Sequence, residues 1–465
     1  MNKKLFPILS AFLLLFSLIE KGQATETYRP ETSVAGFIQL PGSGRQVYNF
    51  NPGWRFFKGD IHGAESVDFD DRSWTIVSTP HTVELMPAEA SGCRNYQGPA
   101  WYRKHFVLPA ETKGKRVLIH FEAAMGKQVL YLNGKRIQEH VGGYLPFTLD
   151  LTTNGIQAGD SCLLAIFVDN SNDKSFPPGK PQYTLDFAYH GGIYRDVWMI
   201  AKSPVSITDP LDSQTVAGGG VFVHFDKISE KSAQVYVNTE LQNDNQHTET
   251  VTVETTLTDA DGKVIKRTSG KLSLKSGEKK IIRQQIEVKS PKLWSPDAPY
   301  LYKVQSRIKK GNQSIDGGIT RIGIRLAEFR GKDGFWLNGK PFVQLVGANR
   351  HQDFAYVGNA LPNSQQWRDA KRLRDAGCTI IRVAHYPQDP SFMDACDELG
   401  MFVIVATPGW QYWNKDVKFG ELVHQNTREM IRRDRNHPSV LMWEPILNET
   451  RYPLDFALKA LEITK

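Results

Sequence analysis

The residues best suited to chemistry are an amide and a carboxylate, Asn448 and Glu449, which follow a short apolar run at 440–443. That run predicts a buried strand. A glutamate just past the carboxyl end of a strand lies where α/β barrels hold their catalytic groups. There it could protonate a leaving oxygen and later take a proton from water. An isolated Asn-Glu pair can also be an ordinary helix start, so its meaning depends on the elements around it.

The elements around this pair alternate between strand and helix patterns from Gly334 onward. The expected strands are 342–347, 379–384, 401–406 and 440–443. Three helices are expected between them, one capped by Ser364 and ended by Gly377, one ended by Gly400, and one at 422–433. Such alternation predicts parallel βα units, and four of them correspond to half of a (β/α)8 TIM barrel.

Two all-β sections precede these units. Short strands and turn signals run from about 47 to 202, and the pair Asn133-Gly134 predicts a tight hairpin. This section is expected to be a jelly roll or sandwich. Alternating strands at 204–326 predict an immunoglobulin-like β-sandwich. The predicted division of the chain is 1–24, 25–203, 204–327 and 328–465.

The composition and the first residues bear on the compartment and on partners. The net charge of +7 is spread over 465 residues without a block of Lys and Arg, so no nucleic-acid partner is expected. A basic start, an apolar stretch at 5–19 and a small-x-small site ending at Ala24 predict a signal peptide. The stretch is short for a membrane span, so we expect an exported protein, periplasmic or secreted, without membrane insertion after cleavage. The four cysteines lack metal-site spacing, and Cys162 and Cys378 are expected to be buried free thiols.

Five stretches, in this order, resemble glycoside hydrolase family two, which includes β-galactosidases and β-glucuronidases. They are Gly-Gly-Ile-Tyr-Arg-Asp-Val-Trp at 191–198, Arg-Ile-Gly-Ile-Arg at 321–325, Gly-Ala-Asn-Arg-His-Gln-Asp at 347–353, Ile-Arg-Val-Ala-His-Tyr-Pro at 381–387 and Asn-His-Pro-Ser-Val at 436–440. The resemblance implies a jelly-roll sugar-binding domain, an immunoglobulin-like sandwich and the N-terminal half of a catalytic TIM barrel.

The resemblance also implies roles for individual residues. Glu449 matches the general acid/base of a retaining enzyme. A carboxyl that acts as a general acid needs a pKa raised by burial and by a second carboxylate. Asn448 matches the residue that binds the sugar hydroxyl next to the reacting carbon. Arg382 would support the nucleophile. His385, His351 and Asp186 match residues that contact the sugar, and Trp410 or Trp413 could stack on a sugar face. Packing roles stay open for these residues, and Arg350 is expected to be structural.

The chain departs from the family pattern in three places. The nucleophile should come from a later strand, but the carboxylates after Glu449 are Asp455 and Glu462, in an apparent helix. We therefore expect a fragment or an early-terminated chain that lacks its nucleophile and is inactive alone. No ligand-type residue follows the third barrel strand, so no metal or other cofactor is expected. Glu444 is a rival acid, although Pro445 beside it favours a structural role.

Three hypotheses follow for the function. The first is a retaining β-galactosidase that cleaves terminal β-linked sugars from an oligosaccharide or glycoside. The second keeps the reaction and changes the substrate to a β-glucuronide or β-galacturonide. The third is a non-catalytic carbohydrate-binding protein, since two β domains and half a site could still bind sugar. The oligomeric state is not predicted.

Overall fold

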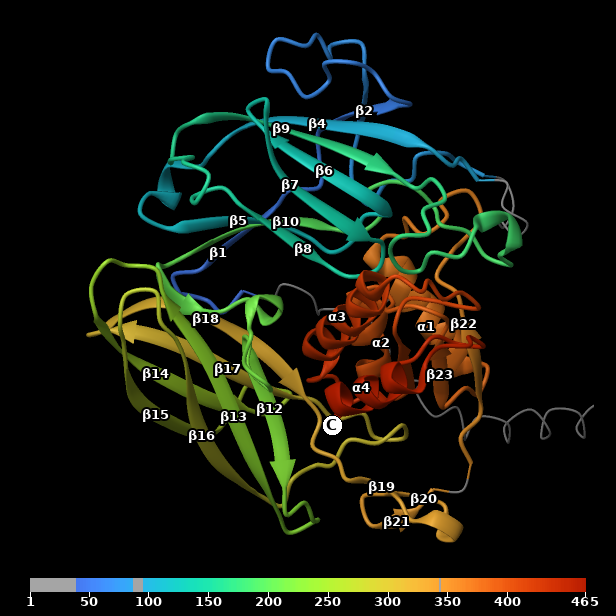
Figure 1. The fold of residues 1–465 in the computed structure, drawn as a ribbon. Helices are drawn as coiled ribbons and strands as arrows, with labels where there is room; N and C mark the ends of the chain where they lie inside the picture. The colour runs from blue at the N-terminus through green and yellow to red at the C-terminus, as the bar shows by residue number, and fades with distance from the viewer. Residues whose placement is uncertain (1–38, 87–94, 343) are drawn as a thin grey trace, which may run out of the picture.

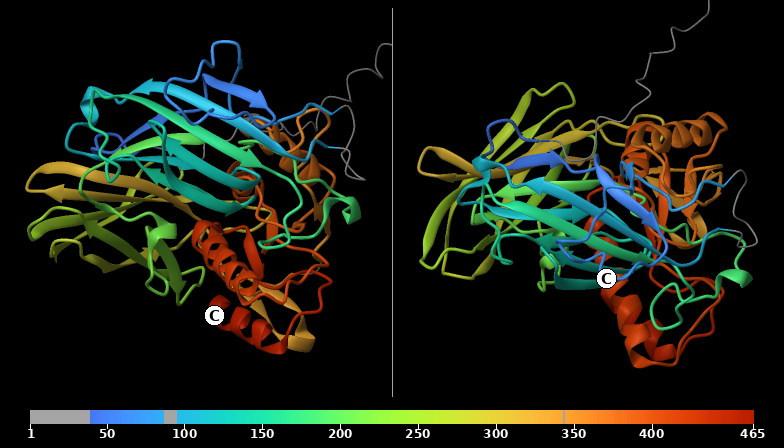
Figure 2. Two further views of the ribbon diagram at one scale, coloured as in Figure 1. Left: turned by 45° about the horizontal axis from the view of Figure 1, so that its top comes forward. Right: turned by 90° about the horizontal axis from the view of Figure 1, so that it is seen from above.

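A computed structural model describes residues 39–86, 95–342 and 344–465, which form three parts in chain order. Figure 1 shows the first β domain lying across the second β domain and the helical part, and the views in Figure 2 agree. The expected signal peptide at 1–24 and Cys93 fall outside the described residues. Within the described residues, no helix is long and apolar enough to cross a membrane.

The first part is a jelly-roll-like sandwich of two sheets, ordered β1-β10-β5-β8 and β3-β2-β4-β9-β6-β7. Its strands are β1 (Gln46–Asn49), β2 (Trp54–Lys58), β3 (Thr75–Val77), β4 (Pro99–Val107), β5 (Arg116–Phe121), β6 (Gly126–Leu132), β7 (Lys135–Gly142), β8 (Phe147–Asp150), β9 (Ser161–Asp169) and β10 (Val197–Lys202). Trp54, Tyr102 and Phe121 fill the space between the sheets. Asn133 and Gly134 join β6 to β7 with positive φ angles of 49° and 81°, as a tight hairpin turn requires.

The second part is an immunoglobulin-like sandwich, as predicted. Its strands are β11 (Val205–Ile207), β12 (Val221–Asp226), β13 (Ser232–Asn243), β14 (Glu249–Thr258), β15 (Val264–Leu274), β16 (Lys279–Lys289), β17 (Tyr302–Lys310) and β18 (Gln313–Ile322). One sheet joins β11, β12 and β16 to β13, and the other runs β15-β14-β17-β18. Alternate side chains such as Val235, Leu257 and Val304 point into the core between them.

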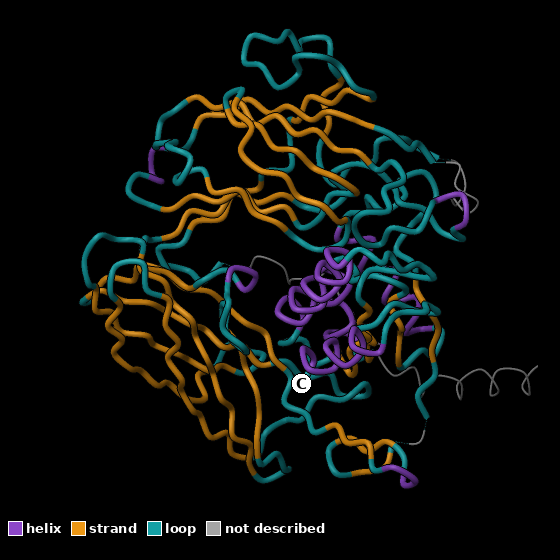
Figure 3. Tube along the Cα trace, viewed as in Figure 1, coloured by secondary structure: helices purple, strands orange, loops and turns teal. Residues whose placement is uncertain are grey.

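The third part contains a small antiparallel sheet followed by four parallel strands with helices (Figure 3). The small sheet is β19 (Ala327–Phe329), β20 (Phe335–Leu337) and β21 (Lys340–Pro341). The parallel strands are β22 (Gly347–Arg350), β23 (Ile380–Val383), β24 (Phe402–Ala406) and β25 (Val440–Glu444). The helices are α1 (Asn363–Asp375), α2 (Pro390–Leu399), α3 (Val417–Asp434) and α4 (Leu454–Thr464). The predicted TIM-barrel half is thereby confirmed.

Three local predictions for this part were wrong. The first barrel strand was expected at 342–347 but lies at 347–350, because Phe342 closes the small sheet by donating its N–H to the Phe335 carbonyl. Ser364 does not cap α1, which begins one residue earlier after Pro362. The run at 440–443 is not fully buried, since Met442 is 39% exposed on a strand at the edge of the described sheet.

The cysteines of the described residues are all free thiols. Cys162 in β9 and Cys396 in α2 are buried, whereas Cys378, just before β23, is only half-buried. Burial raises the pKa of the Cys396 thiol well above its usual value, so this group stays a neutral, apolar part of the barrel core. The expectation of a buried thiol is confirmed for Cys162, whereas Cys378 is less buried than expected.

Arg195 ties the first domain to the barrel. Its side chain is fully buried and donates to the Tyr144 carbonyl at 3.0 Å, to Gln352 Oε1 at 3.0 Å and to the Pro387 carbonyl at 2.8 Å. Asp389 lies 3.7 Å away and balances the charge. The stretch 191–198, recognised in the sequence, therefore works as a domain clamp.

Arg321 and Arg325 tie the second domain to the barrel in the same way. Arg321 donates to Glu398 at 2.6 Å and to Asp394 at 2.8 Å, both on α2. Arg325 donates to the Pro438 carbonyl at 2.6 Å, in the turn before β25. These contacts fix the barrel strands relative to both β domains.

Replacement of Arg195 by Met is expected to destabilise the chain. The change removes the cation that balances the buried Asp389 carboxylate, and it leaves Gln352 Oε1 and two buried carbonyls without their donor. Such losses cost about 3–5 kcal/mol. Chemical denaturation of the 465-residue chain measures this. Lys340→Met is the matched control, because the Lys340–Glu230 pair is exposed and should contribute less than about 1 kcal/mol. Equal stability of the two variants would contradict the clamp.

Candidate active site

The parallel pairing of the barrel strands brings their carboxyl ends together. In the sheet, Arg382 lies beside Asn349 on one side and Ile404 on the other, and Ala406 lies beside Glu444. Residues that follow these positions therefore emerge at one edge of the sheet, which is where open α/β sheets bind ligands. The Asn448–Glu449 pair and the two predicted histidines all emerge there.

One guanidinium organises this edge. Arg382 binds both carboxylate oxygens of Glu444, with an Nε–Oε2 distance of 2.7 Å, and its Nη2 donates to Asn448 Oδ1 at 3.1 Å. Because both oxygens of Glu444 are held by Arg382, Glu444 is engaged as a structural partner of the guanidinium. The amide of Asn448 is oriented with its NH2 group left for other acceptors.

Glu449 is exposed at the end of this network. Its Oε2 accepts a hydrogen bond from Gln411 Nε2 at 2.6 Å and another from Trp410 Nε1 at 3.1 Å. The Gln411 and Trp410 hydrogen bonds, helped by the charges of His385 and Lys180, hold the pKa of Glu449 below its usual value. The expected raised pKa was therefore wrong for the unliganded chain, because the described residues leave this carboxyl exposed and both donors favour its charged form.

The loops after β24 and β25 are paired with each other beyond the strands. Trp410 forms a parallel bridge with Asn448, and the Gln411 N–H donates to the Asn448 carbonyl at 3.0 Å. Gln411 and Glu449 both have a φ of 48°, the left-handed region that costs an ordinary residue about 1 kcal/mol or more. The pairing holds both residues in that conformation, so the donors and the acceptor face each other.

The two predicted histidines lie beside this carboxylate. The His385 ring is parallel to the Trp410 ring, with ring centroids 5.9 Å apart. The ring centroids of His351 and His385 are 6.0 Å apart. Burial lowers the pKa of His351, and burial together with the Arg382 charge lowers that of His385 to about 4, so both imidazoles are neutral near pH 7. His385 Nδ1 is buried without a partner among the described residues and could bond a ligand hydroxyl.

The first domain reaches this edge through the loop that precedes β10. Asp186 is exposed on that loop, and its charge partly opposes the lowering of the pKa of both histidines. Phe187 packs against His351 with ring centroids 4.6 Å apart. Lys180 lies with its Nζ 3.2 Å from the Trp410 ring centroid and 2.8 Å from Gln411 Oε1. Sequence reasoning missed Lys180 and Gln411, because no motif marks either residue.

The remaining candidates have packing roles in the structure. Lys180 lies over one face of Trp410, so that face is not open for the expected sugar stacking. Trp413 packs against Phe419 and Phe456 in a separate core cluster. Arg350, which was expected to be structural, is buried. It binds Asp369 and Gln366 of α1 and Gln388 of the loop before α2.

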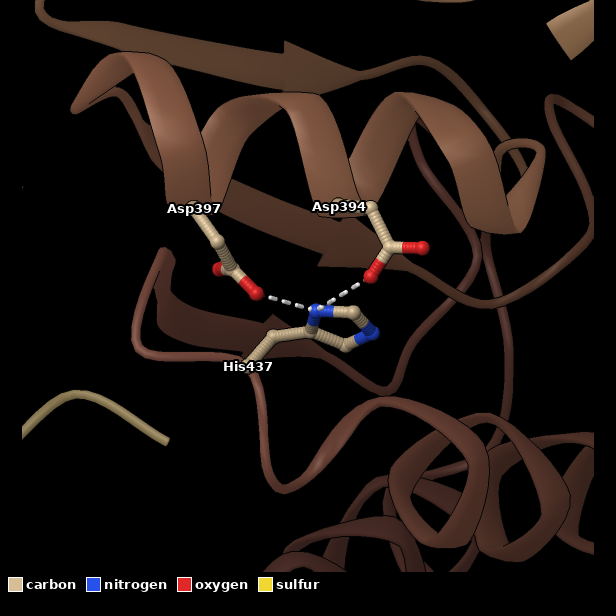
Figure 4. Close-up of side chains that lie close together, drawn as sticks. All are labelled: Asp394, Asp397 and His437. Atoms are coloured by element: carbon tan, nitrogen blue, oxygen red, sulfur yellow. Dashed lines mark hydrogen bonds and ion pairs between the residues drawn. The ribbon is translucent and has the colours of Figure 1, made fainter. Parts of the chain in front are cut away.

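A separate group of possible metal ligands lies at the opposite end of the barrel strands. Asp394 and Asp397 on α2 converge on His437 in the turn before β25 (Figure 4). His437 Nδ1 is 2.6 Å from Asp397 and 4.0 Å from Asp394. Asp394 also binds Arg321, and Asp397 accepts the Ser439 N–H. These donors use the carboxylate oxygens, so the cluster is explained as an ion-pair network that anchors the turn.

The comparisons with known proteins agree with this architecture. Family models match 64–204 ("Glycosyl hydrolases family 2, sugar binding domain"), 219–325 ("Glycosyl hydrolases family 2") and 329–463 ("Glycosyl hydrolases family 2, TIM barrel domain"). Among relatives, a β-galactosidase of Thermoanaerobacter pseudethanolicus is 36% identical over 90% of this chain and 54% of its own length. A β-glucuronidase of Formosa agariphila is 32% identical over 87% of this chain and 42% of its own length.

Solved structures give the same result. The structure of a β-glucuronidase from glycoside hydrolase family 2 superposes with a TM-score of 0.83 at 31% identity, covering 92% of this chain and 46% of that one. Bacteroides uniformis β-glucuronidase 2, covalently bound to cyclophellitol-6-carboxylate aziridine, superposes with a TM-score of 0.79 at 31% identity, covering 90% and 50%. This chain thus spans about half the length of the curated relatives it matches.

The stability of the chain is expected to fall as the pH rises through about 9. Burial by itself would lower the pKa of His437, but Asp397 and Asp394 outweigh it and raise the pKa to about 9 from 6.5. The linked stabilisation, on the order of 3 kcal/mol, is present below pH 6.5 and is lost as the pH rises through 9. Unfolding curves between pH 6 and 10 measure it.

The control for this pH dependence is a pair of variants. His437→Gln should remove most of the slope, and His62→Gln, which changes an exposed histidine of the first domain, should keep it. A slope unchanged by His437→Gln would show that other groups cause the pH dependence.

Proposed function

Because the chain belongs to glycosyl hydrolase family 2, we propose that it carries the acid/base side of the active site of an exo-acting, retaining β-glycosidase. The single observation that carries this proposal is the position of Glu449. It follows the fourth parallel strand, at the edge where Arg382, Asn448 and two neutral histidines meet. A carboxylate in such surroundings has the chemistry of a glycosidic acid/base.

In the proposed reaction, protonated Glu449 gives its proton to the glycosidic oxygen as the bond to the anomeric carbon breaks. A second carboxylate attacks that carbon, and ionised Glu449 later takes a proton from the water that releases the sugar. Glu444 does not suit the second role, since Arg382 binds both of its oxygens. Asn448, oriented by Arg382, presents its NH2 group to a sugar hydroxyl.

The lowered pKa of Glu449 means that this pKa must rise on substrate binding before Glu449 can act as an acid. In the unliganded chain the carboxyl is exposed and its hydrogen bonds favour the charged form. A bound sugar that displaces water, together with a second carboxylate nearby, would raise the pKa toward the range that an acid needs. The free form is therefore prepared as a base, and substrate binding would convert it to an acid.

A terminal β-galactoside is the first substrate that we propose, and a β-glucuronide or β-galacturonide is the second. The relative with 36% identity is a β-galactosidase, which supports the first. The β-glucuronidase at 32% identity supports the second. We also propose export to the periplasm or the outside, on the basis of the basic and apolar pattern at 1–24; N-terminal sequencing of the mature protein tests it.

Glu449→Gln is expected to slow cleavage of substrates with poor leaving groups far more than cleavage of activated ones. An alkyl or sugar leaving group needs the proton, so kcat/KM should fall by about 10²–10⁴-fold. A dinitrophenyl glycoside leaves without it, so its kcat/KM should change little. Steady-state kinetics of the full-length enzyme on both substrates measure the contrast.

The control for this experiment is Glu462→Gln, which neutralises an exposed glutamate of α4. It should leave both substrates unaffected. Equal losses on the two substrates in Glu449→Gln would remove Glu449 from the acid role. Glu444→Gln tests Glu444 as the alternative acid. Loss of the ion pair with Arg382 should slow cleavage of both substrates alike.

A panel of aryl β-galactoside, β-glucuronide and β-galacturonide is expected to separate the proposed substrates, with the galactoside giving the highest kcat/KM. Calorimetry of the 465-residue chain with the free sugars tests the alternative of a non-catalytic carbohydrate-binding protein. Sugar binding without turnover by the full-length protein on any member of the panel would favour that alternative over the enzyme.

A further inference from the structure

We propose that Lys180, a residue of the sugar-binding domain, is a positioning residue that orients Gln411 and Trp410 and thereby sets the orientation and proton affinity of Glu449. The proposal deepens the proposed function and rests on it for its catalytic meaning. Its structural content, a coupling between Lys180 and Glu449 through two neighbours, can be tested without turnover.

The loop that carries Lys180 is fitted closely to the barrel. Gly179 has a φ of 71°, and a Cβ at this position would lie 2.6 Å from the ring of Tyr412. Asn414 donates to the Lys174 carbonyl at 2.7 Å, and the Tyr412 hydroxyl donates to the same carbonyl at 3.3 Å. The loop of the first domain and the loop after β24 are therefore held at a fixed distance, which determines where the lysine lies.

The ammonium of Lys180 is placed between the two donors of Glu449. Lys180 is only 7% exposed, which is unusual for a lysine, and burial lowers its pKa while the charges of Asp186 and Glu449 act against that shift. Its Nζ lies 2.8 Å from Gln411 Oε1 and 3.2 Å from the Trp410 ring centroid. An ammonium over an indole face is held there by cation–π attraction.

The lysine determines which way the Gln411 amide points. An ammonium can only donate hydrogen bonds, so Gln411 must present its oxygen to Lys180 and its NH2 group to Glu449. Without the lysine, the amide could rotate by half a turn and present its oxygen to Glu449. That arrangement repels a carboxylate and favours a protonated carboxyl, so the lysine favours the ionised form of Glu449.

The other charged groups around Glu449 are accounted for. Lys180 lowers the pKa of Glu449 by its charge, and so does His385, at the end of β23, in the acid range where its imidazole is protonated. Asp186 acts on the cations themselves, because its charge works to raise the pKa of Lys180 and of both histidines. Arg382 acts on His385, but its guanidinium is paired with Glu444. Lys180 is therefore the cation of this group that touches both donors of Glu449.

The catalytic consequence is that the two domains have different roles. The barrel supplies the acid/base, and the sugar-binding domain keeps it ready as a base until substrate arrives. In the kcat/KM profile of the free enzyme, the alkaline limb reports the loss of the proton from the acid. Removing the lysine charge should raise the pKa of Glu449 and so move this limb to higher pH.

Lys180→Met tests the proposal in the 465-residue chain. Carbon-13 NMR of labelled glutamate carboxyls, with Glu449→Gln to assign the resonance, gives the titration midpoint of Glu449. We expect a midpoint at higher pH in Lys180→Met, a return toward the original value in Lys180→Arg, and no change in Lys174→Met, an exposed lysine of the same loop. An unchanged midpoint in a folded Lys180→Met chain would overturn the proposal.

A second variant covers the case in which Lys180→Met does not fold. Gln411→Met keeps the lysine and removes the amide between it and Glu449, so it should also raise the midpoint; an unchanged midpoint there would equally overturn the proposal. In the full-length enzyme, the alkaline limb should move in Lys180→Met while Lys174→Met leaves it in place. If Glu449→Gln shows no leaving-group contrast, the proposed function fails, whereas the titration still decides whether Lys180 acts on Glu449.

Discussion

The parallel register of β23, β24 and β25 is the constraint on which the rest of the site depends. It puts Arg382 on one strand within hydrogen-bond reach of Glu444 at the end of another, and of Asn448 just beyond it. Parallel strands place all their carboxyl ends at one edge, so loops far apart in sequence meet there. A shift of the strand pairing by one residue would turn the Arg382 side chain to the other face of the sheet and break its contacts with Glu444 and Asn448.

The strands alone do not complete this edge, because residues of the first domain take part in it. Arg195 fixes that domain to the barrel through buried contacts with Gln352 and the Pro387 carbonyl, both close in sequence to the two site histidines. With the domain held there, the loop before β10 can bring Lys180 and Asp186 to the site. Domain packing in this protein is therefore a condition of the geometry of the candidate site as well as a source of stability.

The electrostatics of the edge favour one ionised carboxylate. Two neutral donors and a nearby cation stabilise charged Glu449, while burial keeps the histidines neutral. The opposite end of the same strands has the reverse arrangement. There two carboxylates raise the pKa of His437 and keep it charged, in a network that anchors a turn. The same residue types thus hold an ionised, exposed carboxylate at one end and a charged, half-buried histidine at the other, because exposure and partners differ.

Much of the fold could be predicted from the sequence, because local patterns determine it. Short strands with turn signals predicted the first β domain, and alternation predicted the second. The strand–helix order predicted the parallel units, and the Asn133-Gly134 turn lies where its backbone preference requires. The first barrel strand was misplaced because apolar residues such as Phe342 also pack at the end of a sheet, and composition does not distinguish the two uses. Strand ends are set by hydrogen-bond partners that are distant in sequence.

The sequence by itself determined the types of residue at the site: the Asn448–Glu449 pair after a strand, the arginine at 382 and the two histidines. Only the tertiary structure decided what surrounds Glu449. It left the carboxyl exposed with a lowered pKa, gave both oxygens of Glu444 to Arg382, and brought Lys180 from another domain onto Trp410 and Gln411. The physical reason is that pKa values and side-chain orientations depend on atoms a few ångströms away, and those atoms belong to loops more than two hundred residues apart in the chain.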